Sequence, residues 1–332
     1  MRAWVLKKPR PVGENPLEFV DLPIPNPGRG EIRLKVSTCG VCHTDLHTVE
    51  GELALPKLPL VPGHEIVGYV DSLGDGAKRF KKGERVGAFW LYSSCGECKF
   101  CKRGQENLCE NARFTGLHED GGYEEYMVAD ERFVYRIPDA FSDENAAPLL
   151  CAGIIGYRSL VLSEVKPGER LGLFGFGASA HIVIQIARYM GCEVYVFSRS
   201  SEHRALAERL GASWAGSATD NPPEKIDAGI TFAPAGWIVK EGLRVMERGG
   251  TLAINAIHMS PIPKLDYGLI YHERKVRSVA NETRKDAEEL LRLAGEIPIK
   301  TEVKTFDLEM ANHTLNLLKD GKIDGAGVLK LD

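Results

Sequence analysis

The segment Glu169-Arg-Leu-Gly-Leu-Phe174 and the turn Gly175-Phe-Gly-Ala-Ser-Ala180 decide the fold of the C-terminal half of the chain. The first stretch predicts a buried strand, and the apolar run 182–190 predicts a helix after the turn. In a Gly-x-Gly-x-x-Ala turn, the first glycine permits a tight bend and the second lets a pyrophosphate approach the helix N-terminus. Gly-x-Gly alone is weak, but between a strand and a helix it indicates a dinucleotide-binding fold.

Strand and helix patterns continue to alternate after this turn. The expected elements are 193–198, 202–210, 226–232, 237–247 and 251–257. Such alternation predicts a parallel, doubly wound sheet of the Rossmann type, within an α/β protein.

The second strand of this half ends in Ser198 and Arg199. An NAD-binding chain usually carries Asp or Glu here to bind the ribose 2′-hydroxyl. No carboxylate at this position would repel a 2′-phosphate, and a guanidinium can clasp one. The sequence therefore predicts NADP(H) in preference to NAD(H); the alternative is that Arg199 only faces solvent beside the adenine. The expected cofactor-binding residues here are Gly175, Gly177, Ala178, Ser198 and Arg199.

The N-terminal half carries residues that suit a metal ion. They lie in Gly40-Val-Cys42-His43-Thr44-Asp45-Leu-His47, in Gly63-His64-Glu65 and at the isolated Cys151. Two thiolates and one imidazole suit zinc, and three protein ligands leave one coordination position open. Taken alone, Cys39-x-x-Cys42 fits half a zinc ribbon or a redox dithiol equally well, and a cysteine such as Cys151 in an apolar segment is usually core.

A compact loop holds four further cysteines, Cys95, Cys98, Cys101 and Cys109. Four thiolates complete a tetrahedral zinc site and leave no position for a substrate. An iron–sulfur cluster uses similar spacings and is the alternative.

Bulk properties exclude several classes of protein. A chain of 332 residues is long for one core, which favours two domains. The net charge of −4, without a basic tract, argues against a nucleic-acid partner. No 18-residue apolar run and no signal-peptide core occur, so we expect a cytoplasmic protein without a membrane partner. In that compartment the eight cysteines are metal ligands or free thiols.

Residues 40–47 followed by 63–65 resemble the zinc-dependent medium-chain alcohol dehydrogenases, in the bacterial AdhA-like and cinnamyl-alcohol-dehydrogenase-like branch. The resemblance covers essentially the whole chain. It implies a GroES-like, β-rich catalytic domain over 1–150 and 280–332, and a Rossmann cofactor-binding domain over 151–279. It also implies two zinc ions per chain, a small alcohol or aldehyde substrate, and a homodimer or homotetramer.

The resemblance assigns roles to individual residues. It makes Cys42, His64 and Cys151 the ligands of a catalytic zinc, with Glu65 behind the metal as an outer group or occasional ligand. It makes the four-cysteine loop a structural zinc site rather than an iron–sulfur site, and leaves Cys39 as a small buried hydrophobe.

Other family positions concern the proton and the cofactor. The resemblance has Thr44 and His47 pass the substrate proton to solvent, although a lone His47 would otherwise be read as a surface histidine. It places His43 at the cofactor, and Asp45 is expected to orient a ligand imidazole.

The implied reaction is reversible hydride transfer between alcohols and NADP(H), in a cleft between the domains, with aldehyde reduction in reverse. Leu53 replaces a bulky aromatic of some relatives, which favours medium or aromatic primary alcohols; Trp90 is a candidate pocket wall or a core aromatic. One alternative is an NAD-dependent polyol or secondary-alcohol dehydrogenase. Another is a non-catalytic zinc- and NADPH-binding redox sensor, which would have no need of an open zinc site.

Overall fold

The computed structural model describes residues 1–323 and 325–331, which form two compact units. The first unit contains residues 1–151 and 281–295 and the chain from residue 300 onward. The second contains residues 152–280 and 296–299. Asp332, the expected last residue of the catalytic domain, lies outside the described residues.

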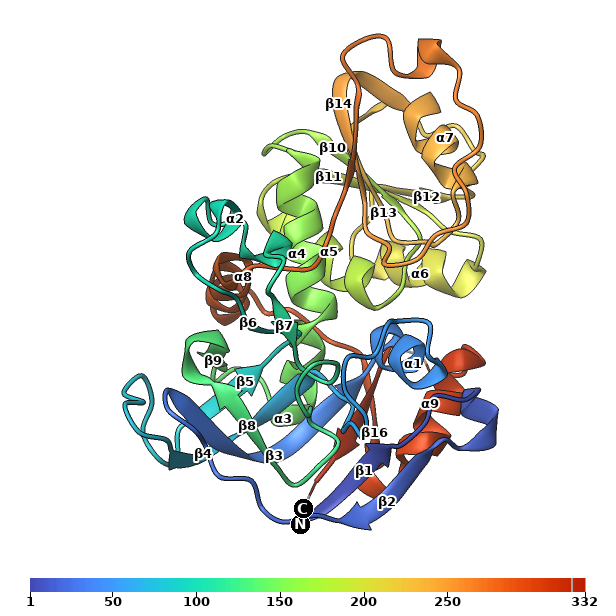
Figure 1. Cartoon of the computed structure of the whole chain (residues 1–332). Coiled ribbons are helices and arrows are strands. Elements are labelled where there is room, and N and C mark those ends of the chain that lie inside the picture. The colour runs from blue at the N-terminus through green and yellow to red at the C-terminus, as the bar shows by residue number, and fades with distance from the viewer. Residues whose placement is uncertain (324, 332) are drawn as a thin grey trace. The chain divides into compact units, whose positions relative to one another are not determined.

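A six-stranded parallel sheet forms the centre of the second unit, as predicted (Figure 1). Its strand order, β12-β11-β10-β13-β14-β15, places the first strand in the middle and winds outward in both directions. The ligand site of such a sheet lies at the carboxyl ends of the two central strands. The strands are β10 (Arg170–Phe174), β11 (Glu193–Phe197), β12 (Trp214–Gly216), β13 (Ile226–Thr231), β14 (Met246–Ile254) and β15 (Lys275–Ser278).

Helices cover both faces of this sheet (Figure 1). On one face α4 packs against α5, whose Ile182, Val183, Ile184 and Ile186 are fully buried. On the other face α7 packs against β13 and β14. The bounds are α4 (Ala152–Ser163), α5 (Ala178–Tyr189), α6 (Ser201–Arg209) and α7 (Trp237–Arg244), with a 3₁₀ turn at Tyr267–Leu269.

Several predicted boundaries in this unit are wrong. The helix expected over 237–247 ends at Arg244, and Met246 already belongs to β14. The helix expected from residue 182 begins at Ala178, because Gly177 is its N-cap and the glycine turn leads straight into it. The strand expected from residue 251 begins at Met246, which pairs with Ile226 ahead of an irregularity in the ladder. That irregularity interrupts the alternating pattern by which a strand is read from sequence.

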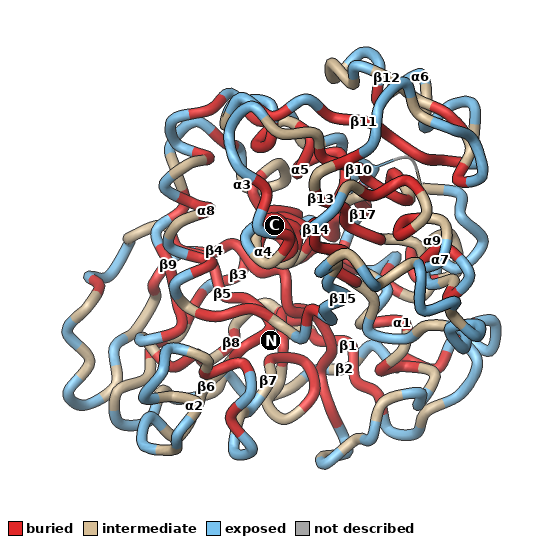
Figure 2. Tube along the Cα trace, turned by 90° about the horizontal axis from the view of Figure 1, so that it is seen from above, coloured by how far each residue is buried: buried red, intermediate tan, exposed pale blue. Residues whose placement is uncertain are grey.

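A seven-stranded sheet forms the core of the first unit. Its order is β16-β17-β3-β4-β5-β9, with β8 also paired to β3, and all pairs are antiparallel except β16 with β17. Figure 2 shows β3, β4 and β5 mostly in the buried class. These strands are β3 (Glu31–Val41), β4 (Glu65–Leu73), β5 (Arg85–Ala88), β8 (Tyr126–Asp130), β9 (Val134–Arg136), β16 (Val303–Asp307) and β17 (Ala326–Lys330).

Two small strand pairs and several short helices complete this unit. The pairs are β1 (Arg2–Leu6) with β2 (Leu17–Asp21), and β6 (Leu91–Ser93) with β7 (Arg113–Phe114). The α-helices are α1 (His43–Glu50), α2 (Lys99–Lys102), α3 (Asp143–Ala146), α8 (Arg284–Glu296) and α9 (Ala311–Lys319). The 3₁₀ turns are η1 (Val12–Glu14), η2 (Glu106–Leu108), η3 (Glu131–Phe133), η4 (Ala147–Leu150) and η6 (Leu308–Met310).

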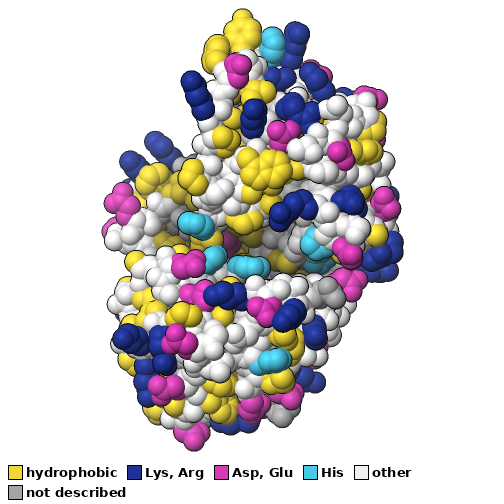
Figure 3. All heavy atoms as spheres, turned by 90° about the vertical axis from the view of Figure 1, so that its right-hand side faces the viewer, with side chains coloured by type: hydrophobic (Ala, Val, Ile, Leu, Met, Phe, Trp, Pro, Cys, Tyr) yellow, Lys and Arg dark blue, Asp and Glu magenta, His cyan; other side chains and the backbone are white. Residues whose placement is uncertain are grey.

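The surface shows no large tract of one charge on the face drawn in Figure 3, where basic and acidic side chains are interspersed. This distribution agrees with nearly equal numbers of Lys and Arg (42) and of Asp and Glu (46). In the part of the chain that the structure describes, no single helix has the length and apolar character needed to cross a membrane. The bent pair Asp143–Leu150 and Ala152–Ser163 meets the criterion only by combined length and composition, as buried core helices also do.

Candidate metal centre and cofactor-binding turn

Four ligand-type side chains meet inside the first unit. Cys42, His64, Glu65 and Cys151 each present a donor atom, and these atoms all lie within 4.8 Å of one another. Cys42 Sγ is 3.2 Å from His64 Nε2 and 4.0 Å from Cys151 Sγ. They come from the start of α1, the start of β4 and the residue after η4, so three distant segments build one cluster.

The N-terminus of α1 fixes two members of this cluster. Cys42 is the N-cap, its Sγ accepts the Thr44 N–H at 3.3 Å, and Asp45 Oδ2 accepts the Cys42 N–H at 3.0 Å. The other oxygen of Asp45 lies 2.8 Å from His64 Nδ1 and accepts its hydrogen bond. A carboxylate at one imidazole nitrogen leaves the other free to bind a metal, and here His64 Nε2 points at Cys42.

Burial makes this cluster unfavourable without a cation. The hydrogen bond with Cys151 and the nearby His64 lower the pKa of the Cys42 thiol well below its ordinary value, although burial opposes this. Burial, together with the charge of Cys42, raises the pKa of Glu65 well above its ordinary value. The two directions show that this buried space disfavours a second negative charge beside Cys42, so a bound cation would be needed to hold Cys42 and Cys151 together as thiolates.

The donor set and its spacing fit a zinc ion. Zinc–sulfur bonds of about 2.3 Å at a tetrahedral angle place two thiolates about 3.8 Å apart. The Cys42–Cys151 sulfur separation of 4.0 Å is close to this value. Cys39 is fully buried, and its sulfur does not belong to the donor group. Cys39 and Cys42 therefore do not act together as a Cys-x-x-Cys pair in this geometry.

The predicted proton-transfer residues lie on α1. Thr44 is half-buried and follows Cys42 by two positions, while His47 lies one turn further along the helix. His47 Nδ1 is 2.5 Å from Glu52 Oε2, and the Glu52 side chain is 53% exposed. Sequence reasoning missed Glu52, because the left-handed Gly51 that ends α1 turns the chain back toward His47. The predicted cofactor residue His43 begins α1 and is exposed.

The four-cysteine loop forms a second cluster in the first unit. The sulfurs of Cys95, Cys98, Cys101 and Cys109 lie within 4.8 Å of one another. Cys95 Sγ is 3.9 Å from Cys101 Sγ and 3.5 Å from Cys109 Sγ. The Cys98 N–H points at Cys95 Sγ at 3.4 Å, and the Cys101 N–H points at Cys98 Sγ at 3.5 Å. These backbone hydrogen bonds stabilise thiolates and suit a closed tetrahedral metal site.

The glycine turn of the second unit has the form of a pyrophosphate-binding site. Gly175 has φ of +91°, and a Cβ there would lie 3.0 Å from the backbone nitrogen of Ala233, so a glycine is required. Gly177 caps α5, and a Cβ there would meet no atom within 4 Å. The N–H groups at the start of α5, which includes Ala178, therefore face space that a phosphate can fill.

The end of β11 carries both basic and acidic groups. Ser198 is buried, and Arg199 is exposed. Arg204 Nη1 donates to the carbonyls of Ser198 at 2.7 Å and Arg199 at 2.9 Å. Glu202 accepts hydrogen bonds from the hydroxyls of Ser200 and Ser201. Sequence reasoning missed Arg204 and Glu202, because only the first turn of α6 brings them back to the strand end.

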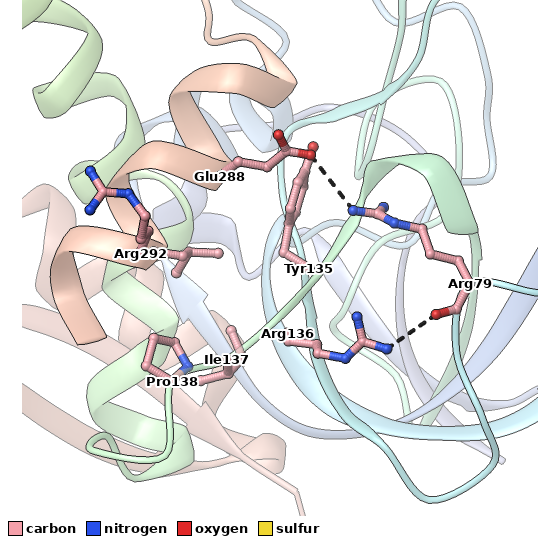
Figure 4. Close-up of a pocket in the computed structure, with 8 residues that line it drawn as sticks. Arg79, Tyr135, Arg136, Ile137, Pro138, Glu288 and Arg292 are labelled. Atoms are coloured by element: carbon pink, nitrogen blue, oxygen red, sulfur yellow. Dashed lines mark hydrogen bonds and ion pairs between the residues drawn. The ribbon is translucent and has the colours of Figure 1, made fainter. Parts of the chain in front are cut away.

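One cavity of the described residues is lined by none of the predicted site residues. Its volume is about 310 Å³, and it lies between β9 and α8 in the first unit (Figure 4). Three of its eight lining residues are arginines. Two of them are already engaged: Arg79 Nη1 donates to two carbonyls, and Arg136 donates to Glu84. The remaining lining residues are Tyr135, Ile137, Pro138, Glu288, Leu291 and Arg292.

Comparison with known proteins gives the family. The profile described as "Alcohol dehydrogenase GroES-like domain" matches residues 28–139, and the profile described as "Zinc-binding dehydrogenase" matches residues 180–296. A protein of Mycobacterium tuberculosis described as a probable alcohol dehydrogenase, AdhA, is 45% identical over 99% of this chain and 97% of its own length.

Two solved structures share the fold over nearly the whole chain. The cinnamyl alcohol dehydrogenase SbCAD4 of Sorghum bicolor has a TM-score of 0.89 at 27% identity and covers 99% of this chain and 97% of its own. CAD from Helicobacter pylori, in complex with NADP(H), has a TM-score of 0.86 at 28% identity and covers 99% of each chain.

The GroES-like and Rossmann-type architecture defines a medium-chain dehydrogenase. The chain belongs to the zinc-dependent medium-chain alcohol dehydrogenase family. It is an oxidoreductase that acts on alcohols and aldehydes.

Proposed function

We propose that the protein is a zinc-dependent, NADP(H)-preferring dehydrogenase of primary alcohols, with medium or aromatic alcohols as substrates and aldehyde reduction as the reverse reaction. The observation that carries the proposal is the cluster of Cys42, His64, Glu65 and Cys151, whose donor atoms lie within 4.8 Å. Cys42, His64 and Cys151 would hold a catalytic zinc ion, and Glu65 would lie behind it.

Zinc held by three protein ligands supplies Lewis-acid polarisation of the substrate oxygen. The four cysteines of residues 95–109 would hold a second zinc ion whose role is structural. Two clusters with metal-ligand geometry in one chain support the expected two ions.

The residues of this chain would orient the ligands and move the proton. Asp45 holds the His64 ring through Nδ1, so that Nε2 stays on the cluster. The Thr44 hydroxyl would accept the substrate proton as it passes its own proton on, and His47 would carry that proton outward. Glu52, which contacts His47 Nδ1 at 2.5 Å, would hold that ring with Nδ1 protonated. Its exposed carboxylate faces solvent, which suits the end of a proton route.

The cofactor preference rests on the end of β11. Arg199 is exposed, and Arg204 Nη1 donates to the carbonyls of Ser198 and Arg199. Two guanidinium groups near the end of β11 support binding of a 2′-phosphate there. Glu202 opposes this preference, because its carboxylate lies at the same helix start. The structurally similar CAD from Helicobacter pylori was solved in complex with NADP(H), which also supports the choice.

Initial rates test the function and the cofactor together. Zinc-loaded protein is assayed through the absorbance of reduced nicotinamide, with NADP+ or NAD+, on ethanol, benzyl alcohol, a secondary alcohol and a polyol. We expect the highest kcat/KM with NADP+ and benzyl alcohol. Preference for NAD+ with a polyol would favour the other dehydrogenase class, and cofactor binding without turnover of any substrate would indicate a non-catalytic protein.

Two variants sharpen the cofactor arm. Arg199→Ala is expected to lower the ratio of kcat/KM for NADP+ over NAD+ by about tenfold, because it removes one charge-assisted contact. Glu202→Gln keeps the shape of the side chain and removes its charge, so the same ratio should rise. If neither variant changes the ratio of kcat/KM for NADP+ over NAD+, the end of β11 does not distinguish the 2′-phosphate from the 2′-hydroxyl.

Assembly and location remain proposals of the same kind. β15 lies at the edge of the six-stranded sheet, and all four of its residues are exposed. An exposed edge strand is a ready pairing surface, which supports the expected homodimer or homotetramer. Light scattering on the purified protein measures the subunit number.

A further inference from the structure

Trp90 is a wall of the candidate metal centre. Its indole lies against the His64 imidazole edge-on, with ring centroids 5.1 Å apart and an interplanar angle of 71°. The other neighbour is Phe114, stacked at 5.0 Å with an angle of 19°. Stacking constrains the plane of an indole more directly than it constrains which edge of the ring carries the N–H, and a buried indole N–H usually has a hydrogen-bond acceptor. A hydrogen bond at Nε1 therefore adds a constraint on which edge of Trp90 faces the centre.

A single hydrogen bond supplies this constraint. The Trp90 indole N–H donates to Asn281 Oδ1 at 3.1 Å, across 191 positions of sequence. Trp90 is 6% exposed, so an indole N–H without that acceptor would lose a hydrogen bond that water cannot easily replace. Asn281 has φ of +52°, a left-handed conformation that asparagine tolerates better than most residues. Both its side chain and its backbone thus suit this position.

The segment after Asn281 is anchored at two points. Asp286 Oδ2 accepts the Thr283 N–H at 2.8 Å and the Thr283 hydroxyl at 2.6 Å, which caps the start of α8. Arg284 grips Glu106 with two parallel contacts, Nε to Oε1 at 2.9 Å and Nη2 to Oε2 at 2.7 Å, and its backbone N–H adds a third at 2.8 Å. Two-point contacts of this kind fix geometry as well as adding energy.

The partner of Arg284 belongs to the four-cysteine loop. Glu106 is 5% exposed and begins η2, and its carbonyl accepts the N–H of Cys109 at 3.0 Å. A second ion pair, from Arg79 Nη2 to Glu288 Oε1 at 3.8 Å, holds the next turn of α8 (Figure 4). The loop around the cysteines is thus connected to Trp90 through Glu106, Arg284 and Asn281, all within the first unit.

We propose that Asn281 is a positioning residue that sets the orientation of Trp90, and that the Arg284–Glu106 pair ties this orientation to the four-cysteine loop. The loop then does more than stabilise the fold: it sets the space beside His64 and hence the size of alcohol that fits. This inference rests on the proposed function, because it assigns the substrate selectivity of that same centre.

Matched variants at one position test the inference. Asn281→Gly tolerates the left-handed backbone but removes the side-chain acceptor of the Trp90 N–H. Asn281→Asp tolerates the same backbone and retains a side-chain oxygen as the acceptor. The measured quantity is the ratio of kcat/KM for benzyl alcohol over ethanol. We expect Asn281→Gly to change this ratio by about threefold to tenfold, mainly through KM, with zinc content unchanged. Asn281→Asp should stay within about twofold of the unaltered protein.

Combining Asn281→Gly with Trp90→Phe distinguishes an effect on the orientation of Trp90 from a general structural effect. Trp90→Phe removes the indole N–H, so adding Asn281→Gly to it should cause no further change in the ratio. Glu106→Gln should move the ratio in the same direction as Asn281→Gly, by a smaller factor. An unchanged ratio in Asn281→Gly, or an equal change in the Trp90→Phe background, would overturn the proposal.

Fluorescence keeps this test independent of turnover. The emission of Trp90 is the difference between the spectra of the unaltered protein and Trp90→Phe. It should shift in Asn281→Gly and stay in place in Asn281→Asp. If the unaltered protein oxidises no alcohol, the proposed function fails. A fluorescence shift in Asn281→Gly would still support the positioning role of Asn281, and the absence of that shift would still contradict the role.

Discussion

The two cysteine clusters in the first unit differ in how the chain builds them. The four-cysteine cluster comes from one loop of fifteen positions, 95–109, and is held by its own backbone N–H groups. The mixed cluster comes from three segments that the sheet brings together, and it includes an imidazole and a carboxylate. A local cluster with four thiolates leaves no open position, whereas a mixed cluster assembled by the fold can leave one. In this chain the donor set expected for a closed site is local, while the donor set expected for an open site is assembled by the tertiary structure.

The largest expected effect comes from removing a ligand of the mixed cluster. Cys151→Ser should lower kcat/KM on the order of a thousandfold, because loss of the metal removes several kcal/mol of charge stabilisation. Zinc analysis should show one ion lost per chain and one retained. The matched control is Cys192→Ser, at a buried cysteine outside both clusters, which should retain both ions. Full activity in Cys151→Ser would remove the basis for calling the mixed cluster catalytic.

Removing a ligand of the local cluster should act on stability first. Cys98→Ser is expected to lower Tm by about 10 °C, because a structural metal contributes directly to folding free energy. At a temperature well below Tm, the activity should fall far less than in Cys151→Ser. Calorimetry and rate measurements on the same sample check both. If Cys98→Ser lost as much activity as Cys151→Ser and kept an unchanged Tm, the proposed distinction between a structural and a catalytic cluster would be wrong.

A smaller effect is expected from the proposed proton route through Thr44 and His47. His47→Gln should lower kcat by about tenfold with both zinc ions retained, because it removes a proton carrier but no ligand. Glu52→Gln keeps the contact and removes the charge, so its effect should be smaller. Steady-state rates together with zinc analysis make the measurement. Loss of zinc from His47→Gln would mean that this residue supports the metal rather than the proton.

The smallest effect concerns the anchor of the local cluster. Burial raises the pKa of Glu106, but hydrogen bonds from the Arg284 side chain and backbone outweigh it and hold the pKa below its ordinary value of 4.5. Since Arg284 is 39% exposed, Glu106→Gln should cost only about 1 kcal/mol at neutral pH.

The pH dependence of this effect follows from its sign. The unfolded chain binds a proton at Glu106 more readily than the folded chain, so the contribution is complete above pH 4.5 and is lost as pH falls through the folded pKa. The Tm difference between the unaltered protein and Glu106→Gln should therefore shrink below that pH. A difference that stays constant from neutral to acidic pH would show that the carboxylate charge contributes nothing.

Local patterns gave much of the fold and of the candidate residues. The strand before Gly175 and the helix after it have opposite periodicities, and the parallel sheet they predict is confirmed. The boundaries at Ala178 and Met246 were missed, because a cap and a ladder irregularity do not change the apolar pattern.

The residues missed at the sites share one property. Glu52 reaches His47 only through the turn at Gly51, and Arg204 reaches the end of β11 only through the first turn of α6. Asn281 meets Trp90 across 191 positions. None of these contacts changes composition or periodicity, so a single sequence carries no signal for them.

The sequence by itself determined the four-cysteine loop and the glycine turn, because each is complete within a few consecutive residues and its spacing alone prescribes its geometry. Only the tertiary structure decided that Cys42, His64, Glu65 and Cys151 share one cluster and that Asn281 holds Trp90 beside it. The physical reason is that such contacts depend on strand pairing across the sheet and on helix caps, which bring together residues whose positions along the chain are unrelated.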